Sequence, residues 1–217
     1  LAEGLSSSEI VRILAETPNL IGSIRRLPPE GSLLPETYHF SFGDSRADII
    51  NRMQKAMKKF IKGAWSERIA GLPFKSPKEA LVLASIIEKE TSVPEERSHV
   101  AAVFINRLRI GMPLQSDPTV IFGVTMGQRS LGRAISKADL RKVTAYNTYL
   151  IKGLPPGSIT NPGSASILAA LHPKNSKDLY FVANGKGGHA FSSSFEEHKK
   201  NVVNWRKVRI KKRNTIN

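Results

Sequence analysis

The chain has 217 residues but no cysteine and no long apolar segment. The absence of cysteine excludes a disulfide scaffold, a cysteine nucleophile and any thiolate metal site. Because no stretch reaches the roughly 18 apolar residues that a membrane helix needs, the sequence predicts no membrane span. It also shows neither a signal peptide nor an initiator methionine, so we expect a fragment whose upstream part, including any membrane anchor, is missing.

Acidic residues are scarce relative to basic ones. Asp and Glu number 18 against 33 Lys and Arg, which gives a formal net charge of +15. Such an excess favours a polyanionic partner or surface, and nucleic acid, anionic lipid and anionic wall polymer all fit. The scattered histidines have no HExxH spacing, and the turn at 185–188 lacks phosphate-loop spacing, so we expect no metal and no cofactor.

Helical periodicity, caps and turn residues predict an α+β fold, mainly helical with a small β-hairpin. The last of the predicted helices is basic, and the 126–135 segment has no assignable feature. We expect helices at 8–16, 44–61, 65–71, 77–90, 95–109, just after Ser136, 165–171 and 195–211, strands at 179–183 and 189–193, and loop with a short strand at 112–125.

Glu90 is the most informative acid in the sequence. At about 100° per residue it lies about 20° from Leu83 and about 40° from Ile86, on the apolar face of its helix, whereas Glu88 points about 160° away. Apolar surroundings raise the pKa of a carboxyl group, and a carboxyl that stays protonated near neutral pH is suited to act as a general acid for glycosidic cleavage. The alternative is a surface residue or an ion-pair partner of Arg or Lys.

Other polar residues have two interpretations each. Asp117 is a candidate for the second carboxylate of a two-acid hydrolase, or it caps a turn before Pro118. Tyr38, Tyr146 and Tyr149 would line a sugar groove or lie partly buried in the core.

Several sequence strings together resemble the YceG-like (MltG) family of endolytic murein transglycosylases. They occur in family order from about residue 30 to the carboxyl end. The strings are ASIIEKET at 84–91, VFINRLRIG at 103–111, LQSDPTV at 114–120, TAYNTY at 144–149, GLPPG at 153–157, NPG at 161–163, LHP at 171–173 and YFVANGKGGHAF at 180–191.

This resemblance implies cleavage of the β-1,4 bond between N-acetylmuramic acid and N-acetylglucosamine. The products would end in 1,6-anhydro-muramyl sugars, and a single carboxylic acid would act as the proton donor, as in the active-site logic of lysozyme. By match to the family, Glu90 is the catalytic residue, acting first as acid and then as base, and Asp117 becomes a positioning residue. Substrate-binding residues by the same match are Gln115, Asp117, Thr119, Tyr146, Asn147, Thr148 and His189.

The resemblance also implies a domain organisation and a location. Residues 1–27 would be a remnant of the LysM-like side and its linker, and residues 28–217 the catalytic domain. The expected substrate is the peptidoglycan glycan strand, at the outer face of the cytoplasmic membrane in the bacterial cell envelope, with peptidoglycan synthases as candidate partners and no nucleic acid. Two alternatives stand: a wall-binding scaffold without activity, and a module that binds polyanions through the basic carboxyl-terminal helix, which otherwise packs through Val202, Trp205 and Val208.

Overall fold

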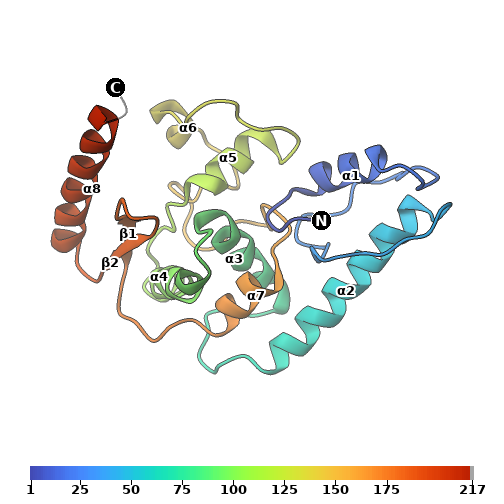
Figure 1. Ribbon diagram of the computed structural model, residues 1–217. Coiled ribbons are helices and arrows are strands. Elements are labelled where there is room, and N and C mark those ends of the chain that lie inside the picture. Colours follow the sequence, from blue (N-terminus) through green and yellow to red (C-terminus); the bar gives the residue numbers. More distant parts are fainter. Residues whose placement is uncertain (216–217) are drawn as a thin grey trace.

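The computed structural model describes residues 1–215, with side chains described through residue 210, and confirms the α+β class. It is mainly helical, with one small antiparallel sheet (Figure 1). The elements are α1 (Ser7–Glu16), α2 (Arg46–Ser66), α3 (Pro77–Glu90), the 3-10 turn η1 (Pro94–Glu96), α4 (Arg97–Arg109), α5 (Asp117–Thr125), α6 (Lys137–Arg141), α7 (Ser164–Leu171), β1 (Tyr180–Ala183), β2 (His189–Ser192) and α8 (Phe195–Thr215).

Helix α3 is the centre of the fold and contacts α2, α4, α5 and α7 (Figure 1). Ser76 caps its amino terminus and Pro77 occupies its first turn, where proline loses no hydrogen bond. Leu83, Ile86 and Ile87 are completely buried in the main core. Packing along most of α3 therefore also fixes the position of its carboxyl end.

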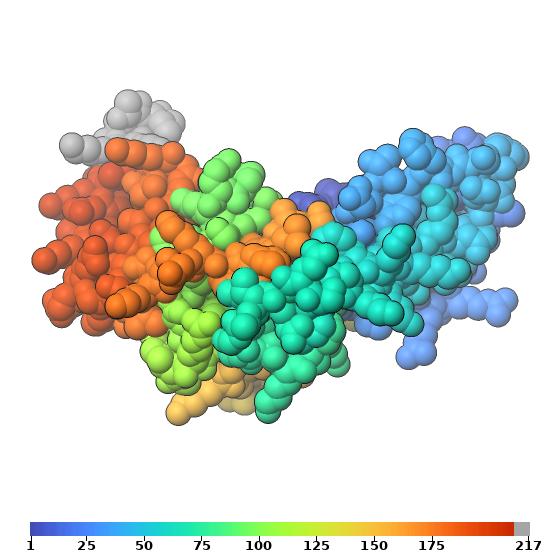
Figure 2. Space-filling view, turned by 90° about the horizontal axis from the view of Figure 1, so that it is seen from below, coloured from blue at the N-terminus to red at the C-terminus, as the bar shows by residue number. Residues whose placement is uncertain are grey.

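Residues near the amino terminus pack on α2 through a second apolar cluster. Ile10 and Leu14 of α1 meet Ile49 and Met53 of α2 there. This part of the chain and α2 form one end of the molecule, opposite the end formed by the carboxyl-terminal residues (Figure 2). The buried Asn161 side chain ties the amino-terminal part to the body, because its amide accepts from Leu33 N–H and donates to the Leu5 carbonyl.

The two strands form the predicted hairpin, with Phe181 opposite Phe191 in the register. Gly185, at φ 78°, opens the turn, and a Cβ at this position would collide with Val208 of α8. Helix α8 thus packs on the hairpin, with Val208 and Trp205, two of the three expected packing residues, beside this glycine. The side chains of Lys211, Lys212 and Arg213, part of the basic stretch, lie outside the described residues.

Two predictions of local structure were wrong. The expected loop and short strand at 112–125 contain α5, because Pro118 starts a helix whose β-branched residues, such as Val120, are buried by tertiary packing. The separate helical turn expected at 65–71 does not exist, since α2 continues to Ser66 and the chain then turns.

Candidate active site

Glu90 is the last residue of α3, partly buried, and faces the amino terminus of α5. Ser116, which precedes α5, donates a hydrogen bond from Oγ to Glu90 Oε1 at 2.5 Å. Ser116 is almost completely buried, whereas its neighbours Gln115 and Asp117 are exposed. The carboxyl of Glu90 is thus held by a buried hydroxyl just below a polar surface.

The pKa of Glu90 is raised to about 7. Burial is the largest cause, and the negative charge of Asp117 adds to it. The hydrogen bond from Ser116 and the positive charges of His189 and Arg107 act in the opposite direction and lower the pKa. Glu90 is therefore a group that exchanges its proton near neutral pH, as general acid–base chemistry requires.

A clamp of hydrogen bonds between two loops positions Ser116. The Thr148 carbonyl accepts from Gln115 N–H at 3.0 Å, and Thr148 Oγ1 accepts from Ser116 N–H at 3.0 Å. Thr119 Oγ1 donates to the Ser116 carbonyl at 2.7 Å, so the 2.8 Å contact between the threonine hydroxyls has Thr148 as donor. Thr119 and Thr148 are completely buried, and their hydroxyls serve this clamp.

Tyr149 extends the clamp to the surface. Its hydroxyl donates to Asp117 Oδ1 at 2.6 Å, which fixes the exposed carboxylate beside Glu90. Burial raises the pKa of Tyr149, and the hydrogen bond to Asp117 raises it further, so the phenol keeps its proton and remains the donor.

His189, at the start of β2, is also held firmly. Glu96 of η1 accepts from His189 N–H at 2.8 Å and contacts its Nδ1 at 2.6 Å. Although burial alone would raise the pKa of Glu96, these bonds and the imidazole charge lower it. The hairpin therefore presents a fixed imidazole close enough to Glu90 to influence its proton affinity.

Arg107 of α4 joins the hairpin to the loop before α5. Its guanidinium donates to the Leu179 carbonyl at 2.7 Å and to the Leu114 carbonyl at 2.7 Å. Burial lowers the pKa of Arg107, and the negative charge of Glu90 opposes that effect. One buried cation thus fixes the separation of two segments that border Glu90.

Besides the buried Thr119 and Thr148, two more of the predicted substrate-binding residues lie away from Glu90 or inside the protein. Asn147 is completely buried, and its side chain closes a turn by donating to the carbonyls of Leu140 and Lys142. Tyr146 packs on Phe122 with ring centroids 4.7 Å apart and lines a separate cavity of about 700 Å³. Asp117 and His189 lie close enough to Glu90 to affect its pKa, and Gln115 directly precedes the Ser116 that bonds to it. Thr119 and Thr148 hold Ser116 from the protein interior.

Comparison with known proteins identifies the family. The sequence profile described as the YceG-like family matches residues 1–204. This chain belongs to the YceG-like family. Among its relatives is an endolytic murein transglycosylase of Bacillus subtilis, 40% identical over 174 residues, which are 80% of this chain and 47% of that protein.

Two further relatives agree with this membership. An endolytic murein transglycosylase of Streptococcus pneumoniae is 32% identical over 216 residues, covering 94% of this chain and 38% of its own length. The crystal structure of a YceG-like protein from Listeria monocytogenes superposes with a TM-score of 0.69 at 35% identity, covering 89% of this chain and 62% of that one. The chain therefore spans about half the length, or less, of the curated relatives named here.

Within this YceG-like chain, Ser116, Arg107 and Glu96 are site residues that sequence reasoning did not select. Ser116 lies 26 positions from Glu90, and only the fold brings the two together. Among residues 1–215, no helix is long and apolar enough to cross a membrane. The same described part of the chain holds no group of His, Cys, Asp and Glu suited to a metal ion.

Proposed function

We propose that this chain is the catalytic part of an endolytic murein transglycosylase. It cleaves the β-1,4 bond between N-acetylmuramic acid and N-acetylglucosamine and leaves 1,6-anhydro-muramyl ends. The observation that carries the proposal is Glu90, a half-buried carboxyl with a pKa of about 7 beside exposed polar groups, in a chain whose relatives are named for this activity.

Glu90 acts twice in this scheme. In the first step the protonated carboxyl gives its proton to the glycosidic oxygen as the bond to C1 breaks, and the muramyl N-acetyl oxygen stabilises the positive charge that develops at C1. In the second step the ionised carboxylate takes the proton of the C6 hydroxyl while O6 bonds to C1. No water is consumed, and Glu90 regains its proton.

The surroundings of Glu90 support both steps. Burial favours the protonated form that starts the reaction, whereas the Ser116 hydroxyl stabilises the carboxylate that forms midway. Helix α5 begins at Asp117, so the positive end of its dipole also lies on the side of this carboxylate. A pKa near neutral pH suits a group that must first donate a proton and then accept one.

We assign the other residues by their exposure. The exposed Gln115 and Asp117 and the partly exposed His189 are our candidates for contacting sugar, with Asp117 oriented by Tyr149. Thr119, Thr148 and Asn147 support the loops, because their side chains are completely buried and bonded within the protein. Tyr146 would contact substrate only through the separate cavity that it lines. The proposed location is the bacterial cell envelope, where an upstream segment would anchor the full-length protein and synthases are candidate partners.

Mass spectrometry of murein digested by this chain tests the proposal. The wild-type chain should release anhydro-muropeptides and the Glu90→Gln variant none, while both melt at a similar temperature at about pH 4, where the Glu90 carboxyl carries almost no ionic penalty in the folded chain. Glu88→Gln is the matched control, since Glu88 accepts from Gly163 N–H, away from the site, and should keep activity. An active Glu90→Gln variant would refute the assignment of Glu90, and products one water heavier would refute the ring-closing second step.

A further inference from the structure

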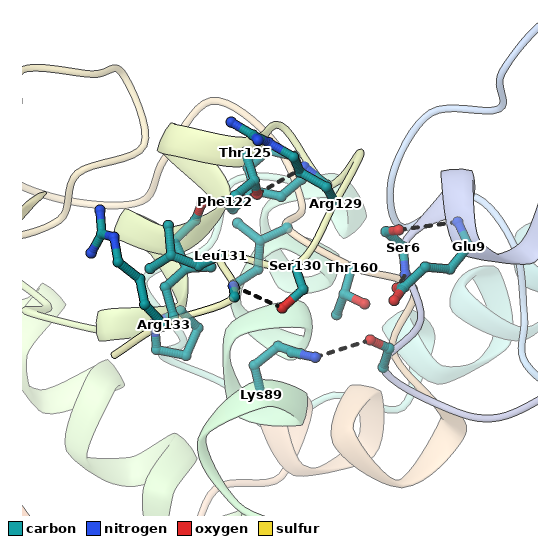
Figure 3. Close-up of a pocket in the computed structure, with 16 residues that line it drawn as sticks. Ser6, Glu9, Lys89, Phe122, Thr125, Arg129, Ser130, Leu131, Arg133 and Thr160 are labelled. Carbon is teal, nitrogen blue, oxygen red and sulfur yellow. Dashed lines mark hydrogen bonds between the residues drawn. The ribbon is translucent and has the colours of Figure 1, made fainter. Parts of the chain in front are cut away.

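A pocket of about 440 Å³ lies directly beside the candidate active site. Residues of α1, the end of α3, α5 and the 126–135 segment line it (Figure 3). The sequence of that last segment has no assignable feature. Lys89 and Pro118 line the pocket, and these residues are the chain neighbours of Glu90 and Asp117. The pocket and the candidate site therefore share two backbone segments, the end of α3 and the start of α5.

The pocket is basic. Lys89 of α3 and Arg129 of the 126–135 segment line it on opposite sides, with Ser130 and Thr160 between them in this view (Figure 3). Lys89 Nζ donates to the Gly4 carbonyl at 3.3 Å, and an ammonium group has further donors to offer. Both basic side chains belong to exposed residues, so they are accessible to a ligand.

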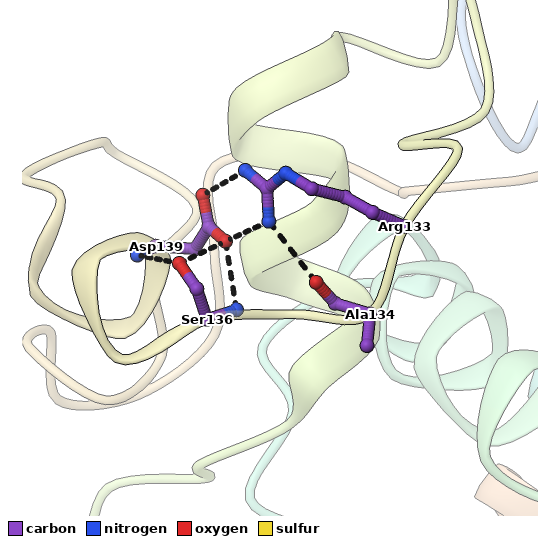
Figure 4. A network of polar contacts seen from close by, with 4 residues as sticks. All are labelled: Arg133, Ala134, Ser136 and Asp139. Atoms are coloured by element: carbon purple, nitrogen blue, oxygen red, sulfur yellow. Dashed lines mark hydrogen bonds and ion pairs between the residues drawn. The ribbon is translucent and has the colours of Figure 1, made fainter.

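The other charged residues of the pocket already have partners. Arg133 forms a bidentate ion pair with Asp139, at 2.6 Å and 2.9 Å, which fixes the end of the 126–135 segment against α6 (Figure 4). Glu9, the acid among the lining residues, accepts from Ser6 N–H at 2.8 Å in the capping box of α1. Glu9 keeps its negative charge, but Lys89 and Arg129 together outweigh it, so the charge offered to a ligand is positive.

Thr160 is a further polar residue of the pocket wall. This residue is 1% exposed and lines the pocket, and its Oγ1 has no hydrogen-bond partner within the described residues. The Oγ1 atom itself has almost no accessible surface, so a ligand would reach it only after a small movement of the pocket wall. A carboxylate accepts hydrogen bonds from a hydroxyl, an ammonium and a guanidinium together.

We propose that this pocket binds the carboxylates of the peptide stem of murein. The inference rests on the proposed function, because it takes the glycan strand as substrate. The sugars of that strand carry amide and hydroxyl groups, and its peptide stems carry free carboxylates. Each stem branches from the lactyl group of a muramyl residue, and the bond to be cleaved is the one at C1 of such a residue. Because the pocket shares the end of α3 and the start of α5 with the candidate site, we assign to it the stem of the muramyl residue that binds at Glu90.

A comparison of two substrates tests this inference. The first is a murein glycan that retains its stems, and the second is the same glycan stripped of stems by an amidase. For the wild-type chain, KM should be lower for the stem-bearing glycan. Because each charged contact in a half-exposed site contributes roughly five- to tenfold, Lys89→Gln and Arg129→Gln should each reduce the KM ratio by about that factor. In the double variant the ratio should approach unity.

Lys62→Gln is the control, since Lys62 is an exposed lysine of α2 outside this pocket. It should leave the ratio unchanged, and Arg129→Lys should restore part of the preference. A binding measurement separates recognition from cleavage: the Glu90→Gln chain titrated with free stem peptide should show binding that the double variant loses. Inorganic phosphate at constant ionic strength should compete much more weakly than the peptide.

The outcomes distinguish this inference from the proposed function. A wild-type chain that cuts both glycans with equal KM, or a double variant that keeps the preference, overturns the stem-binding pocket and leaves the cleavage by Glu90 intact. Phosphate that competes as well as the stem peptide also overturns it, because the pocket would then be a general anion site. A Glu90→Gln chain that still cuts murein overturns the proposed function itself.

Discussion

Replacing Glu90 by glutamine should stabilise the protein at alkaline pH much more than at acid pH. Burial raises the pKa of this carboxyl from 4.5 to about 7 in the folded chain. Below pH 4.5 the folded and unfolded chains both hold the proton, so the carboxyl carries no ionic penalty. As the pH rises toward 7, the unfolded chain loses this proton first, and the free energy of unfolding falls.

The size of the effect follows from the shift. The difference between 4.5 and about 7 corresponds to about 3 kcal/mol at roughly 1.4 kcal/mol per pH unit. Above the folded pKa this full penalty applies to wild type and is absent from the glutamine variant. The glutamine keeps an oxygen that can accept the hydrogen bond from Ser116. Any other effect of the substitution on packing changes the free energy of unfolding equally at every pH.

Urea unfolding of both chains at about pH 4 and about pH 8.5 measures the effect. The change in the variant-minus-wild-type difference between the two pH values should be about 3 kcal/mol, and changes that do not depend on pH cancel. Glu16→Gln, at an exposed position of α1, is the control and should give no such change. A difference of less than about 0.5 kcal/mol for Glu90→Gln would refute the argument, because Glu90 would then ionise in the fold as freely as in the unfolded chain.

Two further substitutions test the contacts that hold the site and the fold. Ser116→Ala removes the hydrogen bond that favours the Glu90 carboxylate, so the alkaline limb of the kcat/KM pH profile for murein cleavage should move up by about one to two pH units, at roughly 1.5–3 kcal/mol for a bond to a charged group. Ser166→Ala is its control, since this buried hydroxyl of α7 has no hydrogen-bond partner among the residues that the structure describes. A limb that stays in place in Ser116→Ala would contradict the proposed effect of the bond. Asn161→Ala removes bonds to Leu33 N–H, the Leu5 carbonyl and the Glu30 carboxylate, and urea unfolding should show a loss of about 2–4 kcal/mol. A loss below about 1 kcal/mol would show that the amino-terminal part is held by its apolar contacts alone.

The features of the site that the sequence predicted are those that depend on local periodicity. Ser76 and Pro77 mark the start of α3, and the 3.6-residue repeat then determines that Glu90 shares a face with Leu83 and Ile86. The buried face of the helix and the raised pKa of Glu90 both follow from that geometry. The hairpin at 180–192 was predictable for a similar reason, since two short apolar runs flank a glycine-rich turn.

Features that depend on long-range packing were not predictable in this way. The residues 119–121 have strand propensity, yet they lie in α5 because helix packing buries Thr119 and Val120. A Cβ at Gly123 would collide with Thr144, so the close approach of α5 to the 144–149 loop depends on this glycine. Nothing in the sequence pairs Ser116 with Glu90, and nothing shows that Tyr146 turns toward a different cavity.

Glu30 shows why a raised pKa alone does not identify the catalytic acid. Burial also raises the pKa of Glu30 to about 7. Its carboxyl, however, accepts from Ser7 N–H and Ser7 Oγ at the amino terminus of α1 and from Asn161 Nδ2. These three donors take most of the acceptor sites of the carboxyl, and the bonds join two parts of the chain. We therefore assign Glu30 a structural role. Glu90, in contrast, accepts one hydrogen bond from a buried hydroxyl and has exposed polar neighbours.

The substitution Glu30→Gln separates the two acids. It should leave murein cleavage within about twofold of wild type at a temperature where the variant is folded, since Glu30 has no role in the proposed proton transfers. It should also flatten the fall of stability between pH 4.5 and about 7, because one of the two carboxyls that retain protons in the fold is gone. Cleavage that disappears in folded Glu30→Gln and persists in Glu90→Gln would exchange the roles of the two residues. The choice between them rests on hydrogen-bond partners, which the pH dependence of stability alone does not reveal.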